Sequence, residues 1–396
     1  MPHRVLYVNG SCRLYGAEGS LLQLLGGLDR GRWEPLAAVP AAGPLARALE
    51  RARVPVVRVP MPLLRRRPHP AALAWTAGRV AAAAVAIARY VRRRGVSLVH
   101  VNTMGAMPAA GLAAALAGVP CVWHLRDLRG VRRAVHVCAG LADAVIAVSR
   151  AVAREAALPA GARPAMHVIH NAIDADAFAR QARPGRTRAE LGVAEGDPLV
   201  AFVAQMAPWK GYERLFRALC ILRERRLPLT AAVAGDASLA RNAAYGLRLH
   251  ALAADLGLEG TVRFLGFRTD VASLLADADV LAVASEAEPF GRVVLEAMAV
   301  GTPVVATGFG GVAEVVEDGR TGVLVRDLSA ESLADALERV LSDDRARAAM
   351  GRAGARRVRA DFGLAEHVRR VCGVYDEVLR ARSLACPAPD RYKGEW

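Results

Sequence analysis

The chain has 396 residues, of which 54% are hydrophobic, and a formal net charge of +15. The chain is longer than the length that a single hydrophobic core usually supports, and its composition is that of a packed globular protein. Two domains are therefore expected. Aromatic residues make up only 5% and do not alternate with basic ones, which argues against a nucleic-acid partner.

The positive charge is concentrated in the first half of the chain. Residues 1–180 hold 24 Arg, no Lys and 9 acidic residues, whereas residues 181–396 hold 29 basic and 29 acidic residues. A cationic N-terminal half favours an anionic partner or surface.

Three features bear on the compartment. The N-terminal RVLYVNG reads as a strand, so no apolar signal segment is expected. The longest uncharged run, 101–123, contains Pro108, Gly111 and Pro120 and divides better into strand, helix and strand than into a membrane span. The six cysteines lack C-x-x-C spacing, which favours a reducing compartment and no zinc site. A cytoplasmic protein is therefore expected.

Strands alternate with helical stretches in the first half, as in α/β proteins with parallel sheets. The expected strands are RVLYVN, LAAVP, VPVVRVP, LVHVN, PCVWHL and AVIAVS. The expected helices are LLQLLGGL, LARALERA, the Ala-rich stretch 71–93 and AAGLAAALAG. These elements predict a first domain over residues 1–180.

The second half repeats the alternation after a polar stretch with Pro and Gly, for which a linker over 181–196 is expected. A second domain over 197–364 follows, with strands PLVAFVAQ, TAAVAGD, TVRFLGF, DVLAVAS, TPVVAT and TGVLV. Apolar residues at helical spacing predict a helix over 365–382, and the tail 383–396 is expected to be poorly ordered.

The most informative stretch is VLAVASEAEPFGRVVLEAMAVG, residues 280–301. It predicts a strand, a loop that holds Glu288, and a helix that opens at Phe290-Gly291 and carries Glu296. Gly291 has no Cβ to keep a ligand from the backbone, and the free N–H groups of the first helical turn can hold sugar hydroxyls or phosphate oxygens. Glu296 can accept both hydroxyls of a ribose. The alternative is an ordinary strand–loop–helix unit with two solvated acids.

This stretch resembles the E-x7-E signature, with its E-P-F-G core, of the retaining glycosyltransferases of family 4 (glycosyl transferases group 1). The resemblance covers roughly residues 4–380 and implies the GT-B fold, in which two Rossmann-like domains with parallel sheets face a cleft. It implies that the N-terminal domain binds the acceptor and that the C-terminal domain binds a nucleoside-diphosphate sugar. It also implies that Glu288 meets the donor sugar, Glu296 the ribose, and that Phe290 and Gly291 belong to the donor site.

The segment AQMAPWKGYERLFRAL, residues 204–219, is similar to the family's Gly-Arg-Leu and Lys-Gly segment. The resemblance implies that Lys210 neutralises the donor diphosphate. Gln205 stands where the family has Arg and brings no charge, so another cation compensates, turnover is slow, or catalysis is lost. The motifs VAGD and RFLGFRTDV add further implied donor-binding residues, namely Gly235, Gly266, Phe267 and Arg268.

In the first half, the loop NGSCRLYGAEGS resembles a family entry motif with Tyr15 in place of Gly, which implies Gly16 near the donor phosphates or the acceptor. His124 ends the strand in VWHL, where the family often has a histidine beside the donor sugar. A histidine bonded only to backbone is an equal alternative. Arg126 and Asn171 are the expected acceptor-side residues. Asp174 equally well caps a helix.

The resemblance implies sugar transfer to an acceptor hydroxyl with retained configuration and no metal or other cofactor. Asp277 and Asp279 form a D-x-D pattern that a helix-to-strand junction explains better than a metal site. An anionic or lipid-linked acceptor, or an anionic membrane, would suit the basic half, with 63–70 and 90–94 as contacts and a peripheral role in cell-surface glycan assembly.

Three other functions stay open at this point. A soluble secondary metabolite is an alternative acceptor. A nucleotide-sugar epimerase of the same fold would need placed catalytic carboxylates and histidines. A non-catalytic nucleotide-sugar-binding protein is suggested by Gln205.

Overall fold

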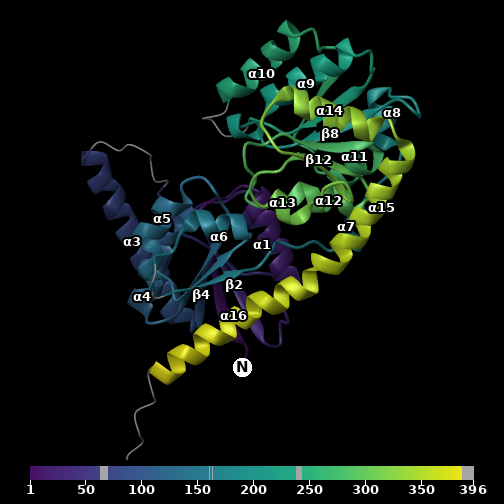
Figure 1. Cartoon of the computed structure of the whole chain (residues 1–396). Helices are drawn as coiled ribbons and strands as arrows, with labels where there is room; N and C mark the ends of the chain where they lie inside the picture. The colour runs from purple at the N-terminus through teal and green to yellow at the C-terminus, as the bar shows by residue number, and fades with distance from the viewer. Residues whose placement is uncertain (63–69, 160, 163, 238–242, 386–396) are drawn as a thin grey trace, which may run out of the picture. The chain divides into compact units, whose positions relative to one another are not determined.

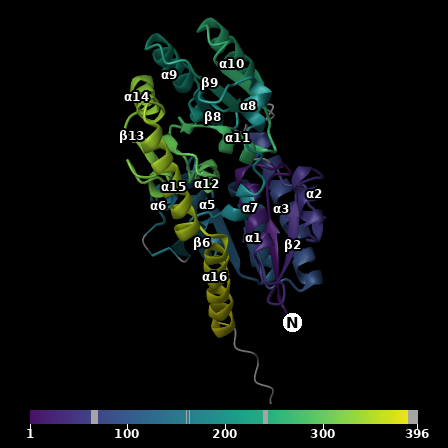
Figure 2. The same cartoon turned by 90° about the vertical axis from the view of Figure 1, so that its right-hand side faces the viewer.

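The structure is a computed structural model that describes residues 1–62, 70–159, 161–162, 164–237 and 243–385. These residues form two compact units (Figures 1 and 2). One unit comprises Met1–Val148, Val152–Ile169 and Ala365–Trp396, as far as they are described, and the other comprises Ser149–Ala151 and His170–Leu364. The expected boundary at 180 therefore differs from the observed one by eleven residues, and the three residues 149–151 group with the second unit.

The first unit is built on a seven-stranded parallel sheet in the order β3-β2-β1-β4-β5-β6-β7. Its strands are β1 (His3–Val8), β2 (Trp33–Val39), β3 (Val56–Arg58), β4 (Leu98–Val101), β5 (Cys121–Leu125), β6 (Ala144–Ala147) and β7 (Ala165–Val168). Strands buried on both faces read as continuous apolar runs, and β4, β5 and β6 are buried along their whole length. The register pairs Val5 of β1 with Leu98 of β4.

Helices connect these strands. They are α1 (Gly16–Gly26), α2 (Pro44–Arg51), α3 (Pro70–Arg94), α4 (Met107–Ala117), α5 (Val131–Cys138) and α6 (Arg150–Ala156), with short 3-10 turns at Met104–Ala106 and Ala139–Leu141. The C-terminal helix α16 (Leu364–Ala385) returns to this unit. Its Tyr375 is fully buried, with its ring centre 5.3 Å from that of Trp33 and its hydroxyl 2.8 Å from His100 Nδ1.

The second unit has a six-stranded parallel sheet in the order β10-β9-β8-β11-β12-β13. Its strands are β8 (Leu199–Val203), β9 (Thr230–Ala234), β10 (Val262–Gly266), β11 (Val280–Val283), β12 (Val304–Thr307) and β13 (Gly322–Val325). Its helices are α7 (Ala175–Ala179), α8 (Arg186–Leu191), α9 (Tyr212–Glu224), α10 (Ala243–Asp255), α11 (Val271–Asp277), α12 (Arg292–Ala299), α13 (Val312–Val315), α14 (Ala330–Leu341) and α15 (Asp344–Asp361), with a 3-10 turn at Pro208–Lys210.

Both sheets are doubly wound, which confirms the predicted α/β fold of two Rossmann-like units. In such sheets the strand order reverses at one place, called the switch point. Ligands bind there, beyond the carboxyl ends of the strands. The switch lies between β1 and β4 in the first unit and between β8 and β11 in the second.

The stretch 181–196, expected to be a linker, is folded against the second unit through α8. The Asp277 carboxylate accepts hydrogen bonds from the backbone N–H groups of Gly185 and Thr187, each at 2.6 Å, and of Arg188 at 3.3 Å. The Arg188 guanidinium also lies 2.7 Å from Asp279. The D-x-D pattern thus anchors α8. The expected tail 383–396 lies mostly outside the described residues.

Candidate functional site

The loop between β11 and α12, residues 284–291, is called the E-P-F-G loop below. Gly291 is the N-cap of α12 with φ +85°, a left-handed conformation that favours glycine. A Cβ at this position would lie 2.9 Å from Val312 Cγ2. The backbone of Gly310 also packs directly on the loop, because a Cβ there would lie 2.1 Å from the Glu288 carbonyl oxygen. The loop is therefore held closely by the residues that follow β12.

Lys210 and Glu288 come together at the switch point of the second sheet. Lys210 follows β8 and Glu288 follows β11, and the Lys210 ammonium contacts Glu288 Oε1. The two side chains are 16% and 9% exposed, so the pair is shielded from water but reachable. Ser285 Oγ donates to the same Glu288 oxygen at 2.7 Å, and Lys210 Nζ lies 4.0 Å from the centre of the Trp209 ring. Ser285 and Trp209 were not expected from the sequence.

Glu296 lies on α12, one helical turn after Arg292. Arg292 Nη2 is 3.1 Å from Glu296 Oε1, and both side chains are mostly buried. This places a cation at the first position of α12, beside the N–H groups that a phosphate would approach. The sequence had left open which cation replaces the family Arg at Gln205, and Arg292 is a candidate for that role.

The other residues expected at the donor lie at the carboxyl ends of β8, β9 and β10. The Nε2 atom of Gln205 is buried and has no hydrogen-bond partner among the described residues. Gly235, after β9, donates its N–H to the Gly266 carbonyl at 2.8 Å, and Phe267 is 55% exposed. Arg268 is engaged by two carboxylates, with its guanidinium 2.5 Å from Glu190 and 2.8 Å from Asp270.

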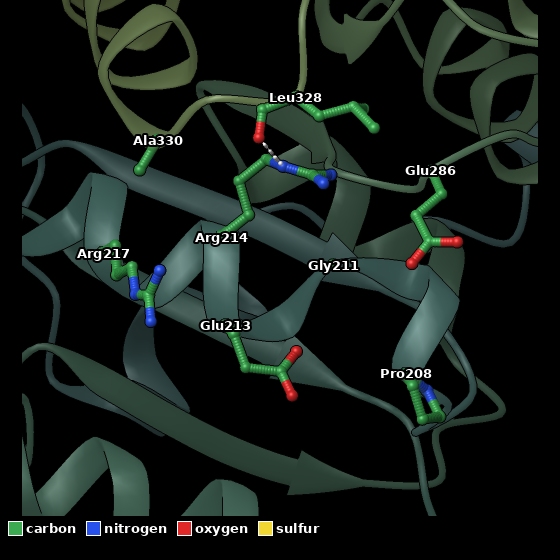
Figure 3. A pocket seen from close by; sticks show the side chains of 8 residues that line it. All are labelled: Pro208, Gly211, Glu213, Arg214, Arg217, Glu286, Leu328 and Ala330. Carbon is green, nitrogen blue, oxygen red and sulfur yellow. Dashed lines mark hydrogen bonds between the residues drawn. The ribbon is translucent and has the colours of Figure 1, made fainter.

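A cavity of about 210 Å³ adjoins this region at the start of α9 (Figure 3). Arg214 extends along it and donates to the Leu328 carbonyl at 2.7 Å, while Glu286 reaches into it from the E-P-F-G loop. The residues that line it are Pro208, Gly211, Glu213, Arg214, Arg217, Glu286, Leu328 and Ala330. The cavity is lined by residues of the turn that carries Lys210 and of the E-P-F-G loop, which carries Glu288. Neither of those two side chains lines it.

In the first unit, a buried polar network crosses the switch point between β1 and β4. Arg126 Nε donates to Asn102 Oδ1 at 2.9 Å, and Asn102 Nδ2 donates to Asn9 Oδ1 at 2.8 Å. Asn9 Nδ2 in turn donates to Glu18 Oε1 at 3.1 Å. Arg126 is thus joined through two asparagines to the first turn of α1. Only Arg126 of this network was singled out from the sequence, because buried asparagines leave no sequence motif.

His124 is fully buried beside this network, and Arg126 Nη2 lies 3.2 Å from its Nδ1. Burial and then the Arg126 charge lower the pKa of His124 well below its ordinary value, so the imidazole is neutral at pH 7. Burial also raises the pKa of the neighbouring Asp127. His124 is therefore placed as a neutral hydrogen-bonding group rather than as a cation.

Gly16 and Asn171 are the remaining residues that the sequence predicts at the site. Gly16 begins α1, and the Glu18 carboxylate accepts the Tyr15 N–H at 3.1 Å, which closes the entry loop onto the helix. Asn171 is buried just after His170. Asp174 accepts the Ala177 N–H at 2.9 Å and caps α7, which was the expected alternative for this residue.

Within the described ranges, no group of three or more His, Cys, Asp or Glu side chains is arranged to hold a metal ion. No helix among the described residues combines the length and hydropathy needed to cross a membrane. Of the two basic stretches, residues 63–69 lie outside the described residues, whereas Arg92, Arg93 and Arg94 form the exposed last turn of α3.

Two protein-family models match the two halves of the chain. The model of Glycosyltransferase Family 4 matches residues 15–177, and that of Glycosyl transferases group 1 matches residues 185–357. A D-inositol 3-phosphate glycosyltransferase of Corynebacterium aurimucosum is 42% identical over 172 residues, which are 42% of this chain and 40% of that protein. The enzyme of that name from Mycobacterium tuberculosis F11 is 36% identical over 206 residues, or 50% and 41% of the two chains. The chain thus spans less than half the length of these curated relatives.

Solved structures match along nearly the whole chain. Anabaena Alr3699/HepE in complex with UDP-glucose superposes with a TM-score of 0.80 at 28% identity, covering 94% of this chain and 99% of that one. A sucrose-phosphate synthase of Thermosynechococcus elongatus, at 22% identity, has a TM-score of 0.76 over 96% and 100% of the two chains and supports the fold alone. Together with the two family models, these matches show that the chain belongs to the group 1, family 4 glycosyltransferases and has their GT-B fold.

Proposed function

We propose that the chain transfers a sugar from a nucleoside-diphosphate sugar to an acceptor hydroxyl with retention of the anomeric configuration. The observation that carries this proposal is the contact of Lys210 with Glu288 at the switch point of the second sheet, next to the N-terminus of α12. The glycosyltransferase names of the relatives and the complexes of the Anabaena protein with UDP and UDP-glucose support it.

The proposed donor site uses charge in a region of low water access. Lys210, Arg292 and the free N–H groups of α12 neutralise the diphosphate, which leaves as an anion. Glu288 orients the sugar and Glu296 the ribose. When no donor is bound, Glu288 neutralises Lys210, so the donor diphosphate must compete for this ammonium when it binds.

The reaction then needs no protein nucleophile. The acceptor oxygen forms a bond to the anomeric carbon on the face that the diphosphate leaves, and the bond from that carbon to the diphosphate oxygen breaks with its electron pair. The acceptor proton passes to the departing diphosphate. Arg126 and Asn171 serve the acceptor, whereas His124, expected beside the donor sugar, is fully buried 3.2 Å from Arg126 and is proposed to hold that side chain in place.

The test is an incubation of the protein with UDP-, GDP- and ADP-sugars and a mixture of acceptor alcohols. The product's anomeric proton coupling, read by NMR, reports the configuration. Transfer with retention supports the proposal, and inversion contradicts it. Interconversion of the free donor would identify an epimerase. Binding of a donor without any turnover would identify a non-catalytic binding protein, the alternative that Gln205 favours because it replaces a cation.

The acceptor is proposed to be anionic or lipid-linked, as in cell-surface glycan assembly, because residues 1–180 carry the whole net charge. A soluble secondary-metabolite acceptor is the alternative. Sedimentation with liposomes of neutral or anionic lipid, at low and raised salt, separates them. Binding that needs anionic lipid and weakens with salt supports a membrane surface, and its absence at low salt contradicts it.

A further inference from the structure

The chain passes between its two units four times, after Val148, Ala151, Ile169 and Leu364. On the side of the second unit, these passages begin or end in three short segments, 149–151, 170–173 and 362–364, called the connecting segments below. The side-chain hydrogen bonds and ring contacts given below for these segments lie within the second unit. Each segment is fixed to the E-P-F-G loop or to α13, which packs on α12 (Figure 1).

The first connecting segment is bonded to the loop backbone. Ser149 is fully buried, and its Oγ donates to the Pro289 carbonyl at 2.7 Å. The two residues are 140 positions apart in the sequence. Pro289 directly follows Glu288, so the hydroxyl of Ser149 helps to fix the peptide that carries the donor-site carboxylate.

Glu314 of α13 joins two connecting segments to each other. Its carboxylate accepts the backbone N–H groups of Arg150 at 3.0 Å and Ala151 at 2.9 Å, and lies 2.9 Å from His170 Nε2. The side chain is only 11% exposed. Burial acts to raise the pKa of Glu314, but these three donors outweigh it and hold the pKa below its ordinary value. The group is therefore an ionised, enclosed carboxylate.

Three rings complete the connection to the loop. The His170 ring centre lies 5.6 Å from that of Phe290 and 5.8 Å from that of Phe362, and the two phenylalanines are 5.9 Å apart. Phe290 and Phe362 are buried. The Ile173 N–H donates to the Phe362 carbonyl at 3.0 Å. The second and third connecting segments thus meet on Phe290, the third residue of E-P-F-G.

We propose that Glu314 and His170 are positioning residues that hold the E-P-F-G loop in its binding conformation and transmit its state to the connecting segments. The proposal rests on the proposed function in one respect, that this loop binds the donor. It adds that donor binding is coupled to the segments through which the chain enters and leaves the second unit. The coupling has a physical basis, because the Glu314 carboxylate and a cluster of three rings in contact connect the loop to these segments.

The chain offers a matched control for Glu314. Asp277 is also a buried carboxylate of the second unit that accepts backbone N–H groups at the start of a helix, but it holds α8 and makes no described contact with the E-P-F-G loop. Glu314→Gln and Asp277→Asn therefore remove the same charge from the same kind of cap. A merely structural role predicts equal effects of the two changes on donor binding.

The first measurement is hydrogen–deuterium exchange without donor. We expect Glu314→Gln to raise exchange in peptides covering 286–291 and 170–173, and Asp277→Asn to raise it around 185–191 only. In the wild type, UDP should lower exchange at 149–152 and 170–173. Faster exchange around 286–291 in both variants, or no change there in Glu314→Gln, overturns the proposal. These results do not require turnover, so they separate this inference from failure of the proposed transferase activity.

The second measurement is steady-state kinetics. We expect Glu314→Gln to raise KM for the donor about 10- to 100-fold with a smaller change in kcat, and Asp277→Asn to leave KM unchanged. Ser149→Ala, which keeps Glu314, should shift KM in the same direction by less. If Glu314→Gln does not fold, Ser149→Ala decides the question by exchange at 286–291. An unchanged exchange rate there, or equal KM in all variants, contradicts a positioning role.

Discussion

Replacing Lys210 by methionine, with and without a second change at Glu288, separates the contribution of the ammonium to stability from its contribution to activity. The change removes the ammonium but keeps an apolar stem of similar length next to Trp209. The Glu288 carboxylate, 9% exposed, is left with the Ser285 hydroxyl as its remaining described donor. Breaking a buried pair costs about 3–5 kcal/mol and breaking an exposed one about 0–1 kcal/mol. Because Lys210 is 16% exposed and one donor remains, we expect a loss of about 2–3 kcal/mol in the free energy of unfolding.

The double variant Lys210→Met/Glu288→Gln removes the stranded charge, so we expect most of the lost stability to return. Activity should not return, because the cation that stabilises the leaving diphosphate is absent and such a contact is worth about 10²–10³ in kcat. Urea unfolding measures the first quantity, and release of the nucleotide from the donor measures the second. A near-wild-type kcat in Lys210→Met would contradict the role of the ammonium in catalysis, and a double variant less stable than the single one would contradict the stranded charge.

Two further changes test the loop and the buried histidines. Gly310 has φ +83° and an added Cβ would lie 2.1 Å from the Glu288 carbonyl, whereas Gly319 has φ +75° and open space around it. Both alanine variants bear the left-handed strain of about 1–2 kcal/mol, so only Gly310→Ala should also weaken donor binding in a titration, and equal binding would contradict the packing argument. Burial and then Arg126 lower the pKa values of His100 and His124 well below 6.5, so the unfolded chain binds protons that the native chain does not. Stability should therefore fall as pH decreases below 6.5, by about 1.4 kcal/mol per histidine between pH 7.5 and 5.5, and urea midpoints that do not change over this range would be the contrary result.

The sequence predicts the fold well where strands are buried on both faces. The run around Val280–Val283 is continuous and apolar, and it forms β11 as expected. The strand β7 was not among the expected strands, because Ala165–Val168 includes His167 and is only partly buried, so its apolar pattern is weak. The polar residues Arg186–Leu191 predict a linker, whereas they form α8, whose first turn is held by the distant Asp277 carboxylate.

The site was predictable in its parts but not in its contacts. Lys210 and Glu288 each belong to a recognisable motif, yet their contact joins residues 78 positions apart and follows only from the strand order. Arg268 was expected near the nucleotide, but in this structure its guanidinium is bound by Glu190 and Asp270, which no motif indicates. No motif indicates Ser285 either, although its hydroxyl donates a hydrogen bond to Glu288.

We propose above all that the paired acids of the second unit bind a nucleoside-diphosphate sugar. A crystal soaked with a non-hydrolysable UDP-sugar tests it most directly, with the corresponding GDP- and ADP-sugars as parallel soaks. We predict density in which Lys210 leaves Glu288 for the diphosphate, the Glu288 carboxylate or its loop meets the sugar, and Glu296 accepts the ribose hydroxyls. A ligand bound elsewhere, with the Lys210–Glu288 contact intact, would show that these acids are not the donor site.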